Sequence, residues 1–453
     1  MTSIPGQNTE PMSGKRTKLA GWGRHEVSGS EERSEDLVAA SERVPLFRGL
    51  GRSYGDSSLP PEGEPRAVNT TLADRILAFH PDTGLLRAEA GLSLFELNRL
   101  FLPRLFFVPV SPGTQFVTLG GMVASDIHGK NHHVDGCFGD HVTRMRMRVA
   151  DGRVLWCSPE EHADLFRATI GGMGLTGHIL EVEFQMKRIP SQWIWQETKR
   201  ISGIDEFQEQ LQASASQWPY TVGWIDCLAK GKGLGRGILM CGRWANSDEA
   251  PRRAPRVLPR PKLPFDFPEW VLGRPSIRAF NQLFYWKHFQ KTRRGIVDPT
   301  SFFYPLDVLR EWNRMYGPRG FTQYQCVLPR EAGTGSARRL LEVLADKGCA
   351  SFLAVIKDFG EGGRGVLSFP EPGVTIALDI PLRDDTQDTI DALNERVIAE
   401  GGRIYLTKDS HTRPEDFQAM EPRLAEFQAI RDVWDPDRRF RSAQSVRLLG
   451  DPA

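Results

Sequence analysis

The chain has 453 residues, of which 40% are hydrophobic and 25% charged, and its formal net charge is +1. This length suffices for two or three domains with separate cores, and the near-neutral charge lacks the basic excess typical of nucleic-acid-binding proteins. The six cysteines are scattered without a C-x-x-C pair, which argues against a zinc site and a disulfide framework and favours a reducing compartment. Because no apolar run resembles a signal-peptide core or a membrane span, a cytoplasmic protein is expected, with a peripheral position at the inner membrane or a periplasmic location left open.

The pattern of expected elements divides the chain into four segments. Residues 1–15 are predicted to be a flexible leader, and residues 16–190 alternate short β-rich runs with helix-like stretches. Residues 191–402 follow the order strand, helix, strand, strand, helix, which is typical of an antiparallel sheet covered on one face. Residues 403–453 form a C-terminal segment with a helix expected over 414–435. The sequence therefore predicts an α+β protein.

Two local signals are more specific. Ser93 precedes a helix-like run and Glu96 follows three residues later, which predicts a helix with a capping box. Residues 251–270 are dense in proline and arginine, so we expect no regular structure there. A solvated surface loop, a lid over a site and a membrane contact are all open interpretations of this stretch.

The first glycine cluster is RGLGRSYGDSS, residues 48–58. Its spacing is G-x-G-x-x-x-G, and the prolines that follow prevent a helix from opening there, so it does not match a dinucleotide fingerprint of the Rossmann type. The chain also lacks the G-x-x-x-x-G-K-[ST] of a P-loop. What remains is either an anion-binding turn or a plain surface turn.

Two further clusters occupy residues 109–133 and 167–179. Small residues in the first of these allow close approach to a flat ligand, and N–H groups at a helix start suit phosphate. Three such loops in one domain together indicate a large anionic ligand such as a dinucleotide.

The motifs R-G-L-G-R-S-Y-G-D, P-G-T-x-x-V-T-L-G-G, D-I-H-G-K-N-H-H and G-G-M-G-L-T-G resemble the FAD fold of the vanillyl-alcohol-oxidase/p-cresol-methylhydroxylase (PCMH) superfamily. The chain resembles most closely the decaprenylphosphoryl-β-D-ribose 2-oxidase family, from about Leu19 to the C-terminus, including LSFPEPG and GGRIYLTKDS. The resemblance implies a two-subdomain PCMH-type FAD-binding domain, a substrate domain built on an antiparallel sheet covered by helices, and a C-terminal segment that returns to the FAD domain.

The resemblance also implies the residues that hold FAD. They are expected to be Arg48, Gly49, Leu50, Gly51, Arg52, Ser53, Tyr54, Gly55, Asp56, Gly113, Thr118, Leu119, Gly120, Gly121, Ser125, Asp126, Ile127, Gly129, Ile179 and Tyr405. Members of the superfamily often tether the flavin through a histidine in the first loop, where this chain has Arg52 and Ser53. A non-covalent FAD is therefore predicted.

Lys408 and His128 are the implied catalytic residues. By resemblance, Lys408 lies beside the flavin and the sugar, where a lysine stabilises the negative charge of reduced flavin, polarises the hydroxyl or, with a lowered pKa, acts as a base. His128 either positions the ring or accepts a proton. The alternative for any single lysine is a solvated side chain. No H-E-x-x-H pattern accompanies His128, so no metal is expected.

The implied substrate contacts are Lys130, Trp224, Phe303, Gln323, Gln325 and Lys357. The two glutamines alternate with Tyr324 along a strand and so share one face. The residues alone are equally consistent with that face being exposed to solvent. Mycobacterial members place a cysteine at the position of Ala377 and a tyrosine at that of Phe303, which puts the exact lipid-sugar in doubt.

The implied activity is oxidation of the 2-hydroxyl of a polyprenylphosphoryl-β-D-ribose to the 2-keto sugar. This is the first half of an epimerisation to the arabinose donor of cell-envelope polysaccharide, completed by a short-chain reductase as partner. The alternatives are an aldonolactone or alditol oxidase that acts on a soluble sugar, and a non-catalytic flavin- or lipid-binding protein. His128 and Lys408 together speak against the last.

Overall fold

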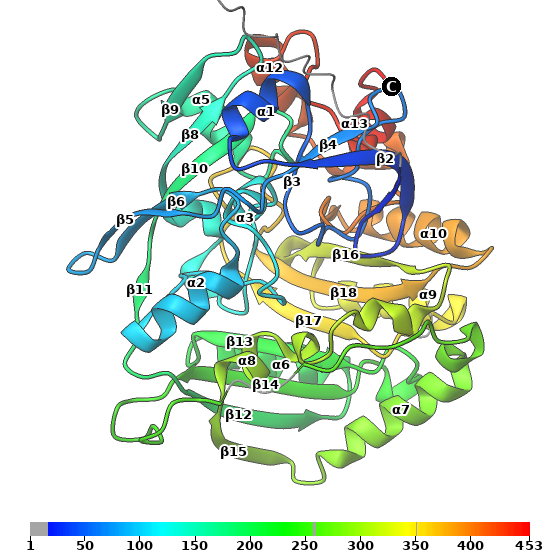
Figure 1. The fold of residues 1–453 in the computed structure, drawn as a ribbon. Coiled ribbons are helices and arrows are strands. Elements are labelled where there is room, and N and C mark those ends of the chain that lie inside the picture. Colours follow the sequence, from blue (N-terminus) through cyan, green and yellow to red (C-terminus); the bar gives the residue numbers. More distant parts are fainter. Residues whose placement is uncertain (1–16, 257–259, 350) are drawn as a thin grey trace, which may run out of the picture.

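The computed structural model describes residues 17–256, 260–349 and 351–453 (Figure 1). The predicted leader, residues 1–15, lies outside the described residues, as do three residues of the 251–270 stretch. The N-terminal elements occupy one end of the molecule, a large sheet occupies the other, and the C-terminal helices return to the N-terminal end (Figure 1).

The N-terminal part contains two sheets. The first has the order β1 (Thr17–Ala20), β2 (Glu26–Arg33), β4 (Arg66–Asn69), β3 (Phe47–Arg48), with β4 parallel to both of its neighbours. The second is antiparallel, in the order β5 (Ile76–His80), β6 (Leu85–Glu89), β10 (His178–Gln185), β8 (Val142–Arg148), β9 (Val154–Cys157). Around them lie α1 (Leu37–Arg43), α2 (Leu94–Phe101), α3 (Leu119–Ala124), α4 (His132–Asp135), α5 (Ala163–Thr169) and the short pair β7 (Phe106–Phe107) and β11 (Lys187–Arg188).

The second part is built on one eight-stranded sheet whose pairings are all antiparallel. Its order is β15 (Thr292–Val297), β12 (Ile194–Ile201), β14 (Gly237–Trp244), β13 (Tyr220–Ile225), β17 (Ala354–Phe359), β18 (Gly373–Pro381), β16 (Phe321–Pro329), β19 (Arg403–Ile404). The helices α6 (Ile204–Ala215), α9 (Ser336–Lys347) and α10 (Thr386–Ala399) bury their apolar sides on one face of it. Two more helices, α7 (Arg274–Lys287) and α8 (Pro299–Phe303), lie in the connection from β14 to β16. The predicted α+β class and helix-covered antiparallel sheet are confirmed.

Alternation along β16 separates the two faces of this sheet. Tyr324, Cys326 and Leu328 belong to the hydrophobic core under the helices. Gln323 and Gln325 point the other way, because successive side chains of a strand face opposite sides. The face without helices therefore carries polar groups into the interior of the molecule.

The C-terminal segment holds two helices where one was expected over 414–435. The first, α11 (Pro414–Met420), ends before Pro422, and α12 (Leu424–Trp434) begins after it. Proline has no N–H to continue the helical hydrogen bonds and its ring clashes with the preceding turn, so the single-helix prediction is wrong. Phe427 of α12 packs with Ala168 and Leu175 of the N-terminal part, and α13 (Ala443–Leu449) follows.

Three local observations complete the fold. Ser93 Oγ accepts a hydrogen bond from Glu96 N at 3.2 Å, which confirms the N-cap, but the Glu96 carboxylate pairs with Arg99, so the reciprocal half of the predicted capping box is missing. In the 251–270 stretch, the described residues as far as 268 form no helix or strand beyond an isolated bridge from Lys262 to Arg310, but a 3-10 helix (Glu269–Leu272) begins at its end, so the prediction of no regular structure is wrong for the last two residues. Across the three described ranges, no helix combines the length and the apolar character required to cross a bilayer.

Candidate active site

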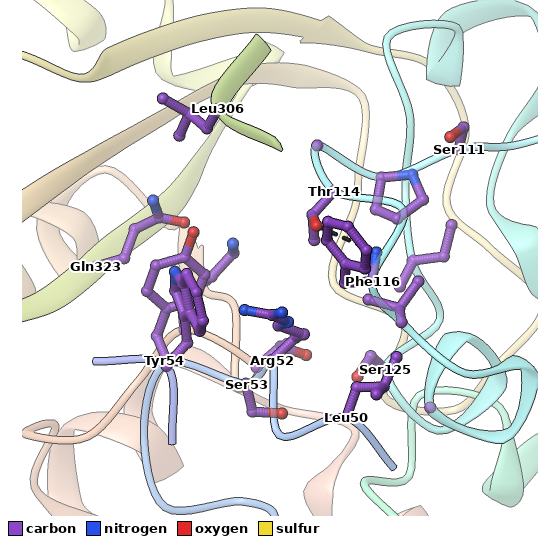
Figure 2. Close-up of a pocket in the computed structure, with 18 of the residues that line it drawn as sticks. Leu50, Arg52, Ser53, Tyr54, Ser111, Thr114, Phe116, Ser125, Leu306 and Gln323 are labelled. Atoms are coloured by element: carbon purple, nitrogen blue, oxygen red, sulfur yellow. Dashed lines mark hydrogen bonds between the residues drawn. The ribbon is translucent and has the colours of Figure 1, made fainter. Parts of the chain in front are cut away.

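A cavity of about 810 Å³ lies between the glycine loops and the helix-free face of the large sheet. Figure 2 shows Arg52 and Tyr54 from the first loop and Phe116 and Ser125 from the second around the cavity, with Gln323 beside Tyr54 and across from Phe116. The cavity thus has a glycine-loop wall and a sheet wall.

The first glycine loop is held against the segment that carries Lys408. Tyr54 N donates to Thr407 O at 3.0 Å. A Cβ on Gly55 would lie 1.8 Å from Asp409 O, so only glycine allows these two backbones to approach so closely. Arg447 of α13 completes the junction, with Nη2 2.9 Å from Asp56 and 2.8 Å from Asp409. Burial acts to raise the pKa of Asp409, but Arg447 and Thr412 hold it below its ordinary value.

The second glycine loop enters α3 with Thr118 as its N-cap, whose Oγ1 accepts from Gly121 N. Thr118 also packs directly against Gly49 of the first loop. A Cβ on Gly49 would lie only 2.3 Å from Thr118 Oγ1, so glycine at this position allows the two loops to come this close. Gly113 is different: a Cβ there would meet no protein atom within 4 Å, and the residue lines the cavity. No described protein atom therefore requires glycine at 113, and the open space is suited to a ligand.

Several buried polar atoms of the glycine-loop wall lack a partner. Ser57 Oγ, Ser58 Oγ and Arg52 Nε are buried and form no hydrogen bond with any described residue. The Arg52 guanidinium stacks over Trp22, 3.8 Å from the ring centroid, and burial lowers its pKa, although Asp307 opposes that shift. Buried donors and hydroxyls are costly unless they are hydrogen-bonded. These atoms and the space at Gly113 fit an extended, phosphate-bearing cofactor.

His128 lies where the two walls meet. Its Nδ1 is 2.9 Å from Lys357 Nζ, and its Nε2 is 3.0 Å from the side-chain nitrogen of Gln325. Burial, followed by the charge of Lys357, keeps the pKa of His128 well below its ordinary value. Burial, followed by the charges of Lys130 and Lys408, does the same to the pKa of Lys357. His128 is therefore neutral near pH 7, and a neutral imidazole offers one N–H and one acceptor to its two neighbours.

Lys130 and Lys408 are the other two lysines of the cavity. Lys130 Nζ donates to Phe303 O at 3.0 Å, and burial lowers its pKa to about 8. Lys408 Nζ lies 3.9 Å from the centroid of the Tyr54 ring and has no hydrogen bond with a described residue. Burial lowers its pKa to about 7, against the opposing charge of Asp379. Lys408 thus exchanges a proton in the physiological pH range and its amine is free to contact a ligand.

Asp379 is fully buried behind the sheet wall. It accepts from Tyr316 Oη at 2.6 Å and from Gln323 Nε2 at 2.5 Å, while burial raises its pKa to about 6. These bonds hold the Gln323 amide at the cavity wall, because Asp379 and Gln323 are paired across β18 and β16.

Most residues singled out from the sequence line this one cavity. They are Arg48, Gly49, Leu50, Gly51, Arg52, Ser53, Tyr54, Gly113, Thr118, Gly120, Gly121, Ser125, Ile127, His128, Gly129, Lys130, Ile179, Trp224, Gln323, Gln325, Lys357, Tyr405 and Lys408. Arg48 also has a structural task, because its guanidinium donates to Ala20 O and pairs with Glu31.

Five residues singled out do not reach the cavity surface. Phe303 is the clearest correction: it is buried among Phe107, Tyr220 and Trp244, and its neighbour Phe302 lines the cavity instead. The other four lie behind the glycine-loop wall, and they are Gly55, Asp56, Leu119 and Asp126. Leu119 belongs to the core, and Asp126 accepts from Gly139 N and Ser368 Oγ.

The structure also adds residues that sequence reasoning missed. Arg447 and Trp22 are not predicted as site residues because their neighbours in the sequence do not distinguish them from a surface arginine and a core tryptophan. Asp379 was predictable from the sequence, because a carboxylate in the otherwise apolar strand GVTIALDIP requires a buried hydrogen-bond partner.

An FAD-binding-domain family matches residues 31–158, the part of the chain that carries the first two glycine loops. The fold, the cavity and this match define the chain as an FAD-dependent oxidoreductase. The decaprenylphosphoryl-β-D-ribose oxidase of Mycolicibacterium smegmatis is 36% identical over an alignment 460 positions long, which covers 97% of this chain and 98% of that protein. The chain belongs to the decaprenylphosphoryl-β-D-ribose oxidase family.

Two other relatives show how far the sequence similarity extends along the chain. A Streptomyces coelicolor protein, described only as an uncharacterised protein in the mprA 5′ region, is 33% identical over 79% of this chain and all of its own length. The D-arabinono-1,4-lactone oxidase of Yarrowia lipolytica is 25% identical over only 25% of this chain and 22% of its own. Similarity to the lactone oxidase is therefore confined to a part of each protein.

Proposed function

We propose that the protein oxidises the 2-hydroxyl of a polyprenylphosphoryl-β-D-ribose to the 2-keto sugar. The observation that carries this proposal is the group of Lys130, Lys357 and Lys408 that lines the cavity together with His128. The ammonium group of Lys130, whose pKa is about 8, suits the phosphate of a lipid-linked sugar, and the amine of Lys408, whose pKa is about 7, suits the removal of a hydroxyl proton.

FAD is held, in this proposal, by the glycine-loop wall. Backbone N–H groups of the first loop and of the start of α3, together with Ser57 and Ser58, receive its phosphates. Arg52 and Ser53 stand where a tethering histidine would be needed, so acid precipitation is expected to release all of the flavin into the supernatant. A pellet that stays yellow would contradict this.

The bound isoalloxazine ring supplies the hydride acceptor. Lys408 in its neutral form takes the proton of the 2-hydroxyl onto Nζ as hydride leaves C2 of the sugar. Gln323, held by Asp379, and Gln325, held against His128, orient the other hydroxyls. Lys130 contacts the phosphate, and that contact further favours its ammonium form by raising its lowered pKa.

A lipid substrate is favoured over a soluble one by the apolar side chains in the cavity lining. They include Trp224, Met240, Phe280, Phe284 and Phe352, which provide an apolar path suited to a polyprenyl chain. The alternative, an aldonolactone or alditol oxidase, has no use for this path. The 2-keto product requires reduction from the opposite face to yield the arabinose donor, which we assign to a separate short-chain reductase.

The test is anaerobic flavin bleaching by a short polyprenylphosphoryl ribose, compared with free alditols and aldonolactones. We expect bleaching by the lipid-linked ribose alone, and none by its 2-deoxy analogue, the matched control. Bleaching by the free sugars at similar concentrations would favour the alternative. Bleaching by the 2-deoxy compound would refute the site of oxidation.

A further inference from the structure

The outer side of α7 carries large apolar side chains in contact with solvent. Leu283 is 72% exposed, Trp286 51%, and Phe289, just after the helix, 74%, while Trp270 before it is 75% exposed. Single exposed apolar residues are ordinary, but several on one short segment indicate an interaction surface.

The helix has two distinct sides. Ile277, Asn281 and Tyr285 are buried at intervals of four and attach it to the body of the protein. Phe280, Leu283 and Trp286 recur at intervals of three on the outer side. In Figure 1, α7 lies at the rim of the molecule, at the opposite end of the view from α12.

The segment is also free of negative charge. No Asp or Glu occurs between Val271 and Val297, a stretch whose cations are Arg274, Arg278, Lys287, Lys291, Arg293 and Arg294. Arg294 pairs with Glu197, whereas the side chains of Arg278, Lys287 and Arg293 have no ion pair or hydrogen bond within the described part of the chain. Apolar residues flanked by unpaired cations are typical of helices that lie in the interface of an anionic membrane.

This surface is continuous with the cavity. Phe280 and Phe284 of α7 line the cavity, and Phe284 contacts Trp224 with ring centroids 4.6 Å apart. A chain leaving the cavity along these rings would emerge beside Leu283 and Trp286.

We propose that the outer side of α7, defined by Leu283, Trp286 and Lys287, docks on an anionic lipid bilayer together with Phe289, just after the helix, and Arg293 of β15. The path of a substrate tail from the bilayer into the cavity rests on the proposed function, whereas docking itself does not. A second copy of this chain is a poorer occupant, because a two-fold contact would set the same cations against each other.

The experiment is co-sedimentation of the FAD-loaded protein with vesicles of phosphatidylglycerol, and with vesicles of phosphatidylcholine as the uncharged comparison. We expect binding to phosphatidylglycerol that weakens with salt, and at least a tenfold loss of affinity in the double variant Leu283→Glu, Trp286→Glu. The matched control is Val433→Glu, which changes a residue 71% exposed on α12 and should bind as the unchanged protein does. A second variant, Lys287→Gln with Arg293→Gln, should lose the preference for phosphatidylglycerol.

Three outcomes would overturn the docking surface. They are no binding of the unchanged protein to phosphatidylglycerol, equal binding of the double variant, or self-association abolished by the double variant without any vesicle binding. Bound flavin, read from its absorbance, reports that each variant is folded. Vesicle binding needs no turnover, so intact binding with no oxidation of lipid-linked ribose would refute the proposed function and leave this surface standing.

Discussion

The glycine-loop wall of the cavity presents backbone, hydroxyls and a stacked arginine, whereas the sheet wall presents long ionisable side chains supported by buried partners. Gly49 and Gly113 illustrate the first, and Lys357 and Gln323 with its buried partner Asp379 the second. Backbone positioned by close packing recognises a ligand of fixed shape at little cost in side-chain entropy. Ionisable groups withdrawn from water acquire shifted pKa values, which is what proton transfer needs. In the function that we propose, the two walls thus divide cofactor binding from chemistry.

The largest effect expected from this division is that of Lys408→Ala. Loss of the proton acceptor should slow flavin reduction by substrate at least about a hundredfold while FAD stays bound. The measurement is anaerobic stopped-flow absorbance, with exposed Lys347→Ala as the matched control. An unchanged rate of flavin reduction would show that Lys408 is not the proton acceptor.

Gly113→Ala tests the opposite wall. Because no atom of the described residues lies within 4 Å of the added methyl group, the apoprotein should be as stable as before, but FAD affinity should fall about tenfold through overlap with the cofactor. Gly295→Ala, which also meets no atom within 4 Å but lies on β15 outside the cavity, is the control for titration with FAD. Equal affinity in the two variants would remove Gly113 from the cofactor site.

Asp379→Asn is expected to shift a pH profile rather than abolish activity. The Asp379 charge raises the pKa of Lys408, so its removal should lower that pKa below about 7. With neutral Lys408 as the base, flavin reduction rises with pH through this pKa, and the rise should move to lower pH in the variant. A rate that falls with pH over the same range would instead identify the ammonium form as the active one.

The smallest effect is expected from thiol alkylation. None of the six cysteines lines the cavity, and burial raises the pKa of each thiol, to about 12 for Cys227 and Cys326. Iodoacetamide at neutral pH should therefore change flavin reduction less than twofold. Rapid inactivation would show that a thiol reaches the cavity after all.

Local signals account for what was predictable from the sequence. The Ser93 cap, the alternation in β16 and the glycine clusters act within a few residues, and each led to the right element. Phe303 was misplaced because it sits on a helix of five residues, where neighbours differ by about 100° and no periodicity reveals which one faces inward. The Asp56–Arg447 contact joins residues 391 positions apart, and no local pattern encodes it.

That contact also sets an order of events during biosynthesis. The first glycine loop emerges from the ribosome long before Arg447, which fastens it to the lysine segment and is made 391 residues after Asp56. With FAD held as we propose, tight cofactor binding is expected only after α13 has been synthesised. A nascent or shortened chain without α13 would hold the flavin loosely, so yellow colour in a preparation reports that α13 is present and has docked.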